Sequence, residues 1–443
     1  MTQLVSPDLI RDRFSKAMSQ MYQQEVPQYR TLLDIVKEVN DRYLQAHPDT
    51  FADADNSREL NRLVVERHGA IRLGKAEELA TMRRLFAVMG MYPVSYYDLS
   101  AAGVPVHATA FRPIDERSLQ YNPFRVFTSL LRLDLIVDTA LKLKVQQILD
   151  KRNIFTPRAL ELTEISEHQQ GLTAAQAEEF VTEALKTFQW HSEAQVDMAT
   201  YQSLLDQHRL IADVVSFKGP HINHLTPRTL DIDAVQKMMP ERGIAPKESI
   251  EGPPPRRVPV LLRQTSFKAL SEKIIFTDSA EGRHTARFGE IEQRGLALTP
   301  AGRELYDRLL QQPATHKAAD SFAAFPDNEE ELRRQKLGYF RYRLKPGKVL
   351  PDKVSREELQ SLISEGIIET SPIIYEDFLP VSAAGIFQSN LGSDRGSVSK
   401  GNPNKAAFEE ALGRQVIDEF SLYQQLEEAS LAGIFTRQSE RFF

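Results

Sequence analysis

The sequence predicts an α+β fold in which two βαβββ units form one curved sheet around a metal site, with a helical insertion and peripheral helices. Two observations predict it. Segments with strand-like alternation are interspersed with segments of helical apolar spacing, and residues 221–295 repeat an earlier region in outline. Each copy has a histidine-bearing strand, a helix ending at a glycine (Gly90, Gly243) and a strand beginning Val-Pro-Val. Such internal similarity is typical of a duplicated unit.

The first copy follows two N-terminal helices. Ser6-Pro7 provides a capping hydroxyl and a proline at the first helical position, and the two helical segments that follow are expected to cover one face of the sheet. Residues 60–74 then predict a strand, and an amphipathic helix ends near Gly90. Two further strands are expected between Tyr92 and Pro113.

The middle of the chain has a different character. Residues 122–208 have helical spacing, with Thr173 and Gln176 forming a predicted capping box, and strands are expected to resume at Leu210. We therefore predict four parts: residues 1–115 with the N-terminal helices and first unit, 116–209 as the helical insertion, 210–300 as the second unit, and 301–443 with C-terminal helices and a site-closing segment.

Composition excludes several classes of protein. The 443 residues include 41% hydrophobic and 26% charged residues, which is ordinary for globular proteins. A net charge of -6 argues against nucleic acid as the main partner. The absence of cysteine excludes disulfides and thiolate metal sites. Without an apolar signal segment or a run of transmembrane length, we expect no membrane partner and a cytoplasmic location.

The repeated histidines suggest a metal site. His68 and His224 fall at the same place in their units, each on a predicted strand that holds the imidazole rigidly. We predict that both converge with Glu290 on one metal ion. Two imidazoles and one carboxylate on one side of a metal leave the other side open, which suits Fe(II) oxygen chemistry. Residue spacing alone leaves Glu292, on the same strand face, as an alternative ligand.

Other side chains could belong to the same site, as rival metal ligands or as a substrate-binding group. Three histidines are rival ligands, for which a surface or supporting role is the simpler interpretation: His107, His221 and His284. Arg72 lies four residues after His68 and therefore shares its strand face. An arginine beside a metal can fix a substrate carboxylate by a bidentate pair, although an ion pair with a nearby glutamate explains it equally well.

Six strings resemble a known family: VERHGAIRLG, MGMYPVSYYDLSAAGVPVHATAFRP, HINHLTPRTLDID, LLRQTSFKALSE, TARFGEIEQRGLALTP and YEDFLPVSAAGIFQSNLG. With them the chain resembles the 2-oxoadipate dioxygenase/decarboxylase family, also called hydroxyglutarate synthases, over essentially its whole length. The resemblance implies a core similar to that of the vicinal oxygen chelate proteins. It also implies that His68, His224 and Glu290 bind iron, since Phe288, Glu290 and Arg294 match the glutamate-ligand pattern of related 2-oxo acid dioxygenases.

The same resemblance implies the substrate contacts and the reaction. Arg72 would hold a substrate carboxylate, and Val381 and Ser382 would offer backbone contacts. The expected activity is Fe(2+)-dependent conversion of 2-oxoadipate and dioxygen to 2-hydroxyglutarate and carbon dioxide, a step in lysine breakdown. Two alternatives stay open: a metal-dependent isomerase or lyase acting on a 2-oxo acid, and a non-catalytic binding protein. The choice of iron over manganese, the substrate chain length, the product stereochemistry and the oligomeric state are not determined by the sequence.

Overall fold

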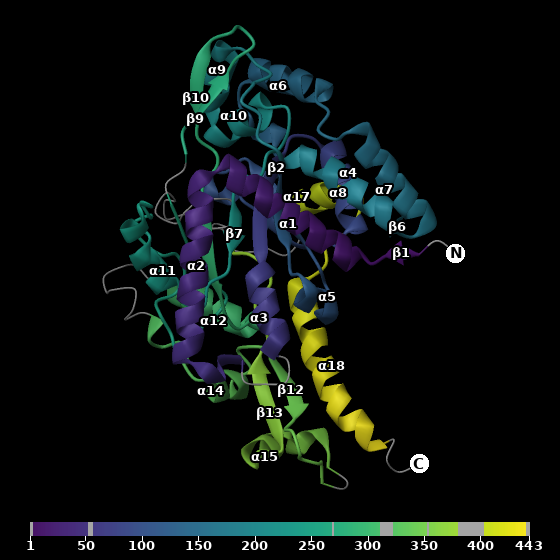
Figure 1. Cartoon of the computed structure of the whole chain (residues 1–443), viewed down its shortest axis with the longest axis vertical. Coiled ribbons are helices and arrows are strands. Elements are labelled where there is room, and N and C mark those ends of the chain that lie inside the picture. The colour runs from purple at the N-terminus through teal and green to yellow at the C-terminus, as the bar shows by residue number, and fades with distance from the viewer. Residues whose placement is uncertain are drawn as a thin grey trace. The chain divides into compact units, whose positions relative to one another are not determined.

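The computed structural model describes residues 3–51, 56–267, 270–310, 322–351, 354–379 and 403–439 (Figure 1). The chain divides into two compact units. Unit 1 contains Met1–Glu251, Gln264–Glu292 and Phe378–Ile417, and unit 2 contains Gly252–Arg263, Gln293–Asp377 and Asp418–Phe443. Helices and open sheets are mixed in the chain, so the predicted α+β class is confirmed.

The first βαβββ unit is present in unit 1. It runs through β2 (Arg67–Leu73), α4 (Ala76–Val88), β3 (Tyr92–Asp98), β4 (Val106–Arg112) and β5 (Arg125–Leu131). Together with β7 (Leu225–Pro227), these strands form a five-stranded sheet in the order β3-β4-β5-β2-β7. β2 and β5 are parallel, whereas β3, β4 and β5 pair antiparallel in succession. The helix α4 ends at Gly90, whose φ of 65° is the left-handed conformation that glycine adopts without strain.

The second copy is shorter but keeps the same order. It contains β7 (Leu225–Pro227), α11 (Ile232–Met238), β8 (Leu262–Ser266) and β11 (Glu290–Arg294), with the hairpin β9 (Glu272–Ile275) and β10 (Glu281–His284) inserted before β11. β7 pairs antiparallel with β2 of the first copy. β8 and β11 form a separate two-stranded sheet, which a parallel bridge between Arg228 and Glu292 links to the end of β7.

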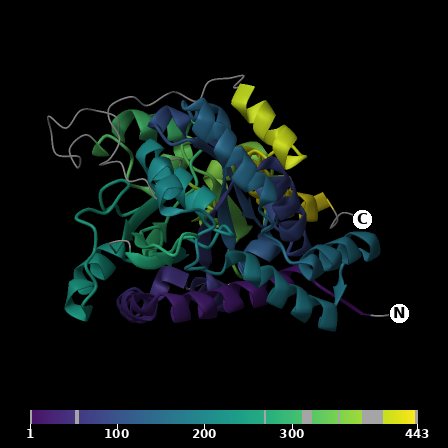
Figure 2. The same ribbon diagram turned by 90° about the horizontal axis from the view of Figure 1, so that it is seen from above.

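The five-stranded sheet has two different faces. Ile71 and Leu73 of β2 belong to a core that includes Phe14 and Tyr22 of α1 (Pro7–Glu25) and Leu32 of α2 (Pro27–Ala46). Both of these helices, drawn in purple, lie on one side of the sheet (Figures 1 and 2), which confirms that they cover a face. Because side chains alternate along a strand, His68, Ala70 and Arg72 occupy the other face.

Four local predictions were wrong. Residues 125–131 were expected to be helical and form β5, which is buried on both faces, so that its residues show no alternation of buried and exposed positions. Residues 210–217 were expected to form a strand, but α10 (Arg209–Ser216) is a helix buried from Leu210 to Ser216. The strand around His224 begins only at Leu225, and residues 60–65 belong to helix α3 (Asn56–Val65).

A further local prediction, the capping box in the middle of the chain, is confirmed. The capping box of Thr173 and Gln176 is present at the start of α8 (Ala174–Leu185). The other elements of unit 1 are β1 (Leu4–Val5), α5 (Glu116–Tyr121), α6 (Thr139–Lys151), α7 (Pro157–Gln169), β6 (Leu172–Thr173), α9 (Met198–Gln207) and α17 (Pro403–Leu412). Unit 2 contains α12 (Pro300–Leu310), α14 (Glu329–Arg334), β12 (Phe340–Leu344), α15 (Leu359–Ser364), β13 (Ile368–Pro372) and α18 (Glu419–Ser439). The four-part division of the chain stays a prediction.

Among the described residues, we find no helix whose length and apolar character would let it cross a bilayer.

Candidate metal centre

Three side chains from distant parts of the sequence meet inside unit 1. His68 comes from β2, His224 from the segment entering β7, and Glu290 from the start of β11. One potential ligand atom of each lies within 4.8 Å of the other two, and all three residues are buried. A Cβ on Gly69 would lie 2.4 Å from Ile222 and 3.2 Å from the His224 carbonyl oxygen. Glycine at this position therefore lets the segment that carries His224 approach β2.

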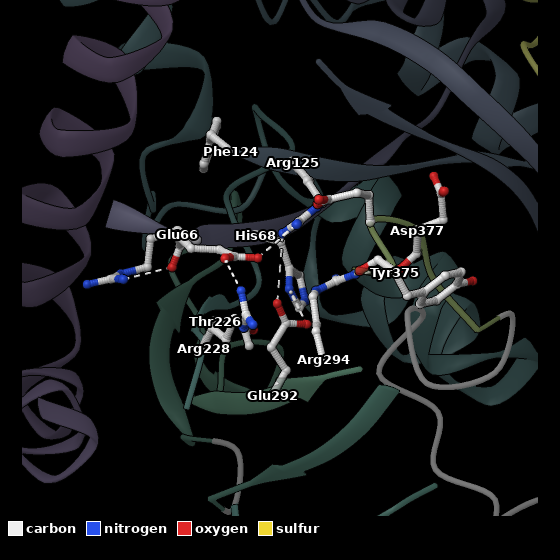
Figure 3. Close-up of polar contacts among 12 residues, drawn as sticks. Glu66, His68, Phe124, Arg125, Thr226, Arg228, Glu292, Arg294, Tyr375 and Asp377 are labelled. Atoms are coloured by element: carbon white, nitrogen blue, oxygen red, sulfur yellow. Dashed lines mark hydrogen bonds and ion pairs between the residues drawn. The ribbon is translucent and has the colours of Figure 1, made fainter. Parts of the chain in front are cut away.

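The His68 imidazole has a carboxylate at each nitrogen. Its Nε2 lies 3.0 Å from Oε1 of Glu290, and its Nδ1 lies 2.9 Å from Oε2 of Glu292. Figure 3 shows the ring directed at Glu292, and the Phe378 ring packs edge-on with its centroid 4.9 Å away. A carboxylate at one nitrogen fixes the ring orientation and leaves the other nitrogen for a metal. Glu292 therefore supports His68 from the side away from Glu290.

The tautomer of His224 follows from its neighbours. Thr226 Oγ1 donates its single proton to Glu290 Oε1 at 3.0 Å, so it can only accept from His224 Nδ1, also at 3.0 Å. Nε2 of the neutral ring then carries a lone pair. This atom is buried and has no hydrogen-bond partner among the described residues. Stacking against Phe288, with centroids 4.9 Å apart, holds the ring in this orientation.

Glu290 is held in the same way, with one oxygen occupied and the other open. Its Oε1 also accepts from Gln264 Nε2 at 3.0 Å, whereas Oε2 is buried without a partner in the described part of the chain. Unpartnered buried polar atoms are rare and require an explanation. A lone-pair nitrogen and a carboxylate oxygen are the donors that a divalent transition metal takes from proteins. The side chains present therefore fit a metal ion.

The titration of these groups also fits metal binding. Burial lowers the pKa of His224 to about 4, so the ring is neutral at pH 7. Burial alone would lower the pKa of His68 too, but the adjacent Glu292 and Glu290 carboxylates outweigh it and raise that pKa. Burial would raise the pKa of Glu290, but the His224 and His68 imidazoles outweigh it and lower the value. The site therefore carries a carboxylate and a neutral imidazole before any metal binds.

A buried network of charges lies beside the centre (Figure 3). Glu66 accepts from Arg125 Nη2 at 2.8 Å and from Arg228 Nη1 at 3.0 Å, and Arg62 is its third partner. Burial would raise the pKa of Glu66, but the three guanidinium groups hold it well below its usual range. Because Arg125 is the cross-strand partner of His68, the network ties β2, β5 and the end of β7 together at the site.

Arg72 is held by a second buried cluster. Its Nη1 lies 2.6 Å from Oδ2 of Asp213, while Oδ1 of the same carboxylate accepts from His221 Nε2 at 3.1 Å and from His284 Nε2 at 2.8 Å. The Tyr201 hydroxyl completes the cluster by donating to His284 Nδ1 at 2.8 Å. Arg72 therefore forms an ion pair, but its partner is an aspartate and not the glutamate that the sequence suggested.

Comparison with known proteins shows the family of the chain. The sequence profile of the 2-oxoadipate dioxygenase/decarboxylase family matches residues 14–390. The chain belongs to this family. It is 59% identical over 440 residues to the 2-oxoadipate dioxygenase/decarboxylase of Escherichia coli strain K12, covering 97% of this chain and 98% of the relative. The Pseudomonas putida relative is 58% identical over 446 residues, covering 96% of each chain.

A solved structure shows the same architecture. The hydroxyglutarate synthase of Pseudomonas putida in complex with 2-oxoadipate superposes with a TM-score of 0.90 and 53% sequence identity, covering 99% of this chain and all of the other. The fold of this chain therefore has a counterpart of known structure. As a member of the 2-oxoadipate dioxygenase/decarboxylase family, the chain is an enzyme.

The structure separates the predicted site residues of this family member. His68, His224 and Glu290 are brought together, whereas the rival ligands are placed elsewhere. His221 and His284 contact Asp213, and His107 lies 3.3 Å from the Tyr96 hydroxyl. Val381 and Ser382 lie outside the described residues. Arg294 bonds to the backbone, because its Nη1 donates to the carbonyl oxygens of Tyr375 and Asp377 (Figure 3).

Sequence reasoning missed several supporting groups. Gln264, Thr226 and Asp213 had not been selected, although each contacts a predicted site residue. For Gln264 and Thr226 a signal existed: each lies two residues from another polar residue, Ser266 or His224, and so shares a strand face with it. Polar residues on one face of a strand in a buried sheet need partners. Asp213 gave no such signal, because the segment around it was assigned to a strand.

Proposed function

We propose that the chain is an Fe(II)-dependent dioxygenase/decarboxylase that converts 2-oxoadipate and dioxygen to 2-hydroxyglutarate and carbon dioxide. His68, His224 and Glu290 would hold the iron. The observation that carries this proposal is the buried group of two imidazoles and one carboxylate, with a lone-pair nitrogen and a carboxylate oxygen left open, in a member of this family. Bound there, iron would supply Lewis acidity and the redox capacity for dioxygen chemistry.

The protein's own groups match a doubly negative 2-oxo acid. A divalent ion with one carboxylate and two neutral imidazoles retains one positive charge, which favours an anionic chelating ligand. Arg72 shares the strand face of His68 and stands four residues further, about 13 Å along the strand at 3.3 Å per residue. The long Arg72 side chain can extend back toward the metal centre over part of this distance. We assign Arg72 to the substrate carboxylate remote from the metal.

The other side chains near the centre orient the proposed metal ligands and Arg72, or shield the centre from water. Thr226 and Gln264 fix the orientation of Glu290, and Glu292 fixes that of His68. Phe288 and Phe378 cover the two imidazoles, so charges inside the cavity interact more strongly than they would in water. Asp213 holds Arg72 in place. Val381 and Ser382 are assigned backbone contacts to the substrate.

The reaction balances without a second organic substrate. The six-carbon 2-oxo diacid loses its first carboxyl group as carbon dioxide, and both oxygen atoms of dioxygen enter the five-carbon hydroxy diacid. Purified protein loaded with Fe(II) should consume dioxygen with 2-oxoadipate and release one carbon dioxide per hydroxy acid formed. Turnover without dioxygen would instead support the isomerase or lyase alternative. A cytoplasmic location and a place in lysine breakdown stay predictions.

A further inference from the structure

Ser266, the last residue of β8, has a buried hydroxyl group for which the described structure provides no partner. The residue is fully buried, and its Oγ makes no hydrogen bond with any described residue. Leaving a buried hydroxyl unpaired is costly, so such a group in a native protein usually has a role that the unliganded chain does not show.

The strand register places this hydroxyl at the metal centre. Phe267 N donates to Gly289 O, and Gly295 N donates to Leu261 O. These hydrogen bonds define an antiparallel pairing of β8 with β11, in which Ser266 is directly opposite Glu290. A Cβ on Gly289 would lie 1.9 Å from the Phe267 ring, which agrees with this register. Because 266 and 290 fall between the hydrogen-bonded pairs, their side chains share a face with Cβ atoms about 5 Å apart.

The neighbouring contacts agree with this orientation. Gln264 lies two residues before Ser266 and therefore on the same strand face, and its amide donates to Glu290 Oε1. Thr265, between them, points the other way and bonds Gln236 of α11. The hydroxyl of Ser266 thus joins Nδ1 of His68, Nε2 of His224 and Oε2 of Glu290 among the buried atoms that make no hydrogen bond with a described residue.

We propose that Ser266 Oγ donates a hydrogen bond to the oxo-carboxylate end of the bound substrate, the end that lies beside Glu290. This inference rests on the proposed function. The hydroxyl can donate because a serine side chain rotates to suit its acceptor, and a carboxylate or keto oxygen of a 2-oxo acid is such an acceptor. Ser266 would then be a substrate-binding residue that recognises the reacting end, whereas Arg72 recognises the far carboxylate.

The Ser266→Ala variant tests this contact, and Ser216→Ala is a matched control. Ser216 is also fully buried with an unpartnered Oγ, but it lies at the end of α10, where its carbonyl oxygen pairs with Gln195. Each protein is loaded with Mn(II), which takes the same kinds of ligand as Fe(II). Binding of 2-oxoadipate is then measured by calorimetry without dioxygen, so that the oxidative reaction cannot proceed. Mn(II) affinity and thermal stability are measured alongside.

We expect Ser266→Ala to weaken 2-oxoadipate binding about tenfold or more, the usual effect of losing a hydrogen bond to a charged group. Its Mn(II) affinity should stay within about twofold of wild type, and its melting temperature should be unchanged or higher, because an unpaired buried hydroxyl is removed. Ser216→Ala should change neither affinity. Unchanged 2-oxoadipate binding in Ser266→Ala would overturn the inference. A lower melting temperature with equal loss of Mn(II) would also overturn it, because the hydroxyl would then be structural.

A substrate analogue separates this contact from the proposed function. 2-Oxohexanoate keeps the oxo-carboxylate end and lacks the far carboxylate. Ser266→Ala should weaken both ligands by the same factor, whereas Arg72→Lys should weaken 2-oxoadipate alone. Loss confined to 2-oxoadipate in Ser266→Ala would contradict the assignment to the reacting end. If metal-loaded wild-type protein bound neither acid, the proposed function itself would fail, and the inference with it.

Discussion

Two buried clusters in unit 1 have nearly the same composition and different chemistry. Each contains two histidines and a carboxylate: His68, His224 and Glu290 in one, and His221, His284 and Asp213 in the other. In the Asp213 cluster both imidazoles bond to the carboxylate, and no buried side-chain atom of these three residues lacks a partner. In the Glu290 cluster, three buried atoms make no hydrogen bond with a described residue: Nδ1 of His68, Nε2 of His224 and Oε2 of Glu290. Of these, His68 Nδ1 lies close to a second carboxylate, 2.9 Å from Oε2 of Glu292. The open atoms, and not the residue types, distinguish a ligand site from a structural one.

Removing one imidazole from each cluster should give the largest contrast. His224→Ala should lower metal affinity and dioxygen consumption by more than about 100-fold, because it deletes a ligand, whereas losing an outer partner costs 10–100-fold. His284→Gln, the control in the other cluster, should retain metal. Metal content by mass spectrometry and oxygen-electrode assays measure both. A His224→Ala protein with full metal content and turnover would remove the basis of the comparison.

The Asp213 cluster should matter most for stability. Asp213→Asn leaves Arg72 without its buried counter-charge and should cost about 3 kcal/mol of unfolding free energy at pH 7. Burial alone would raise the pKa of Asp213, but His221 and Arg72 outweigh it and hold the pKa well below its usual range.

The pH dependence follows from the direction of that shift. A carboxylate whose folded pKa is depressed stabilises the protein above its unfolded pKa, and this contribution is lost as pH falls through the folded value. The difference between wild type and Asp213→Asn should therefore be full at pH 7 and shrink below about pH 4. Denaturant unfolding at several pH values measures it. Equal stability of the two proteins at pH 7 would show that the cluster is not structural.

Arg72 belongs to the structural cluster but is assigned to the substrate, so it tests whether the two clusters work together. Arg72→Lys keeps the charge and loses the planar, bidentate geometry. We expect KM for 2-oxoadipate to rise about tenfold, the effect of losing one charge-assisted hydrogen bond, while metal content is unchanged. Steady-state kinetics at saturating dioxygen measure KM. An unchanged KM would restrict Arg72 to its ion pair with Asp213.

The smallest expected effect distinguishes the two glutamates on β11. Glu292→Gln removes the carboxylate behind His68 Nδ1 and should weaken metal binding about tenfold. Glu290→Gln removes a ligand and should weaken it far more. Competition with a metal-binding dye gives both affinities. Should Glu292→Gln lose metal more completely than Glu290→Gln, the two residues would have to exchange roles.

The sequence predicted the parts of this fold in which local pattern and burial agree. β3, β4 and α4 show clear periods and end at turns or at Gly90. β5 is buried throughout and α10 is buried from Leu210 to Ser216. An element that is buried on every side has no period of buried and exposed residues by which a strand can be told from a helix. Tertiary packing decided both elements.

The two candidate histidine ligands were predictable because the chain repeats, whereas Glu290 was preferred to Glu292 only through the family resemblance. His68 and His224 occupy matching places in two copies, which set them apart from the other histidines. The exclusion of His221 and His284 depended on Asp213, whose position on α10 required the three-dimensional structure. Ser266 could not be selected from sequence either, because its importance lies in a register between β8 and β11 that only the backbone hydrogen bonds define.

Anomalous diffraction at the absorption edge of the bound metal tests the central claim most directly. The account predicts one peak, about 2.0 to 2.3 Å from Nε2 of His68, Nε2 of His224 and a carboxylate oxygen of Glu290, the usual range for such ligands. A peak beside Asp213 and His284, or one bound through Glu292 with His224 uncoordinated, would contradict it.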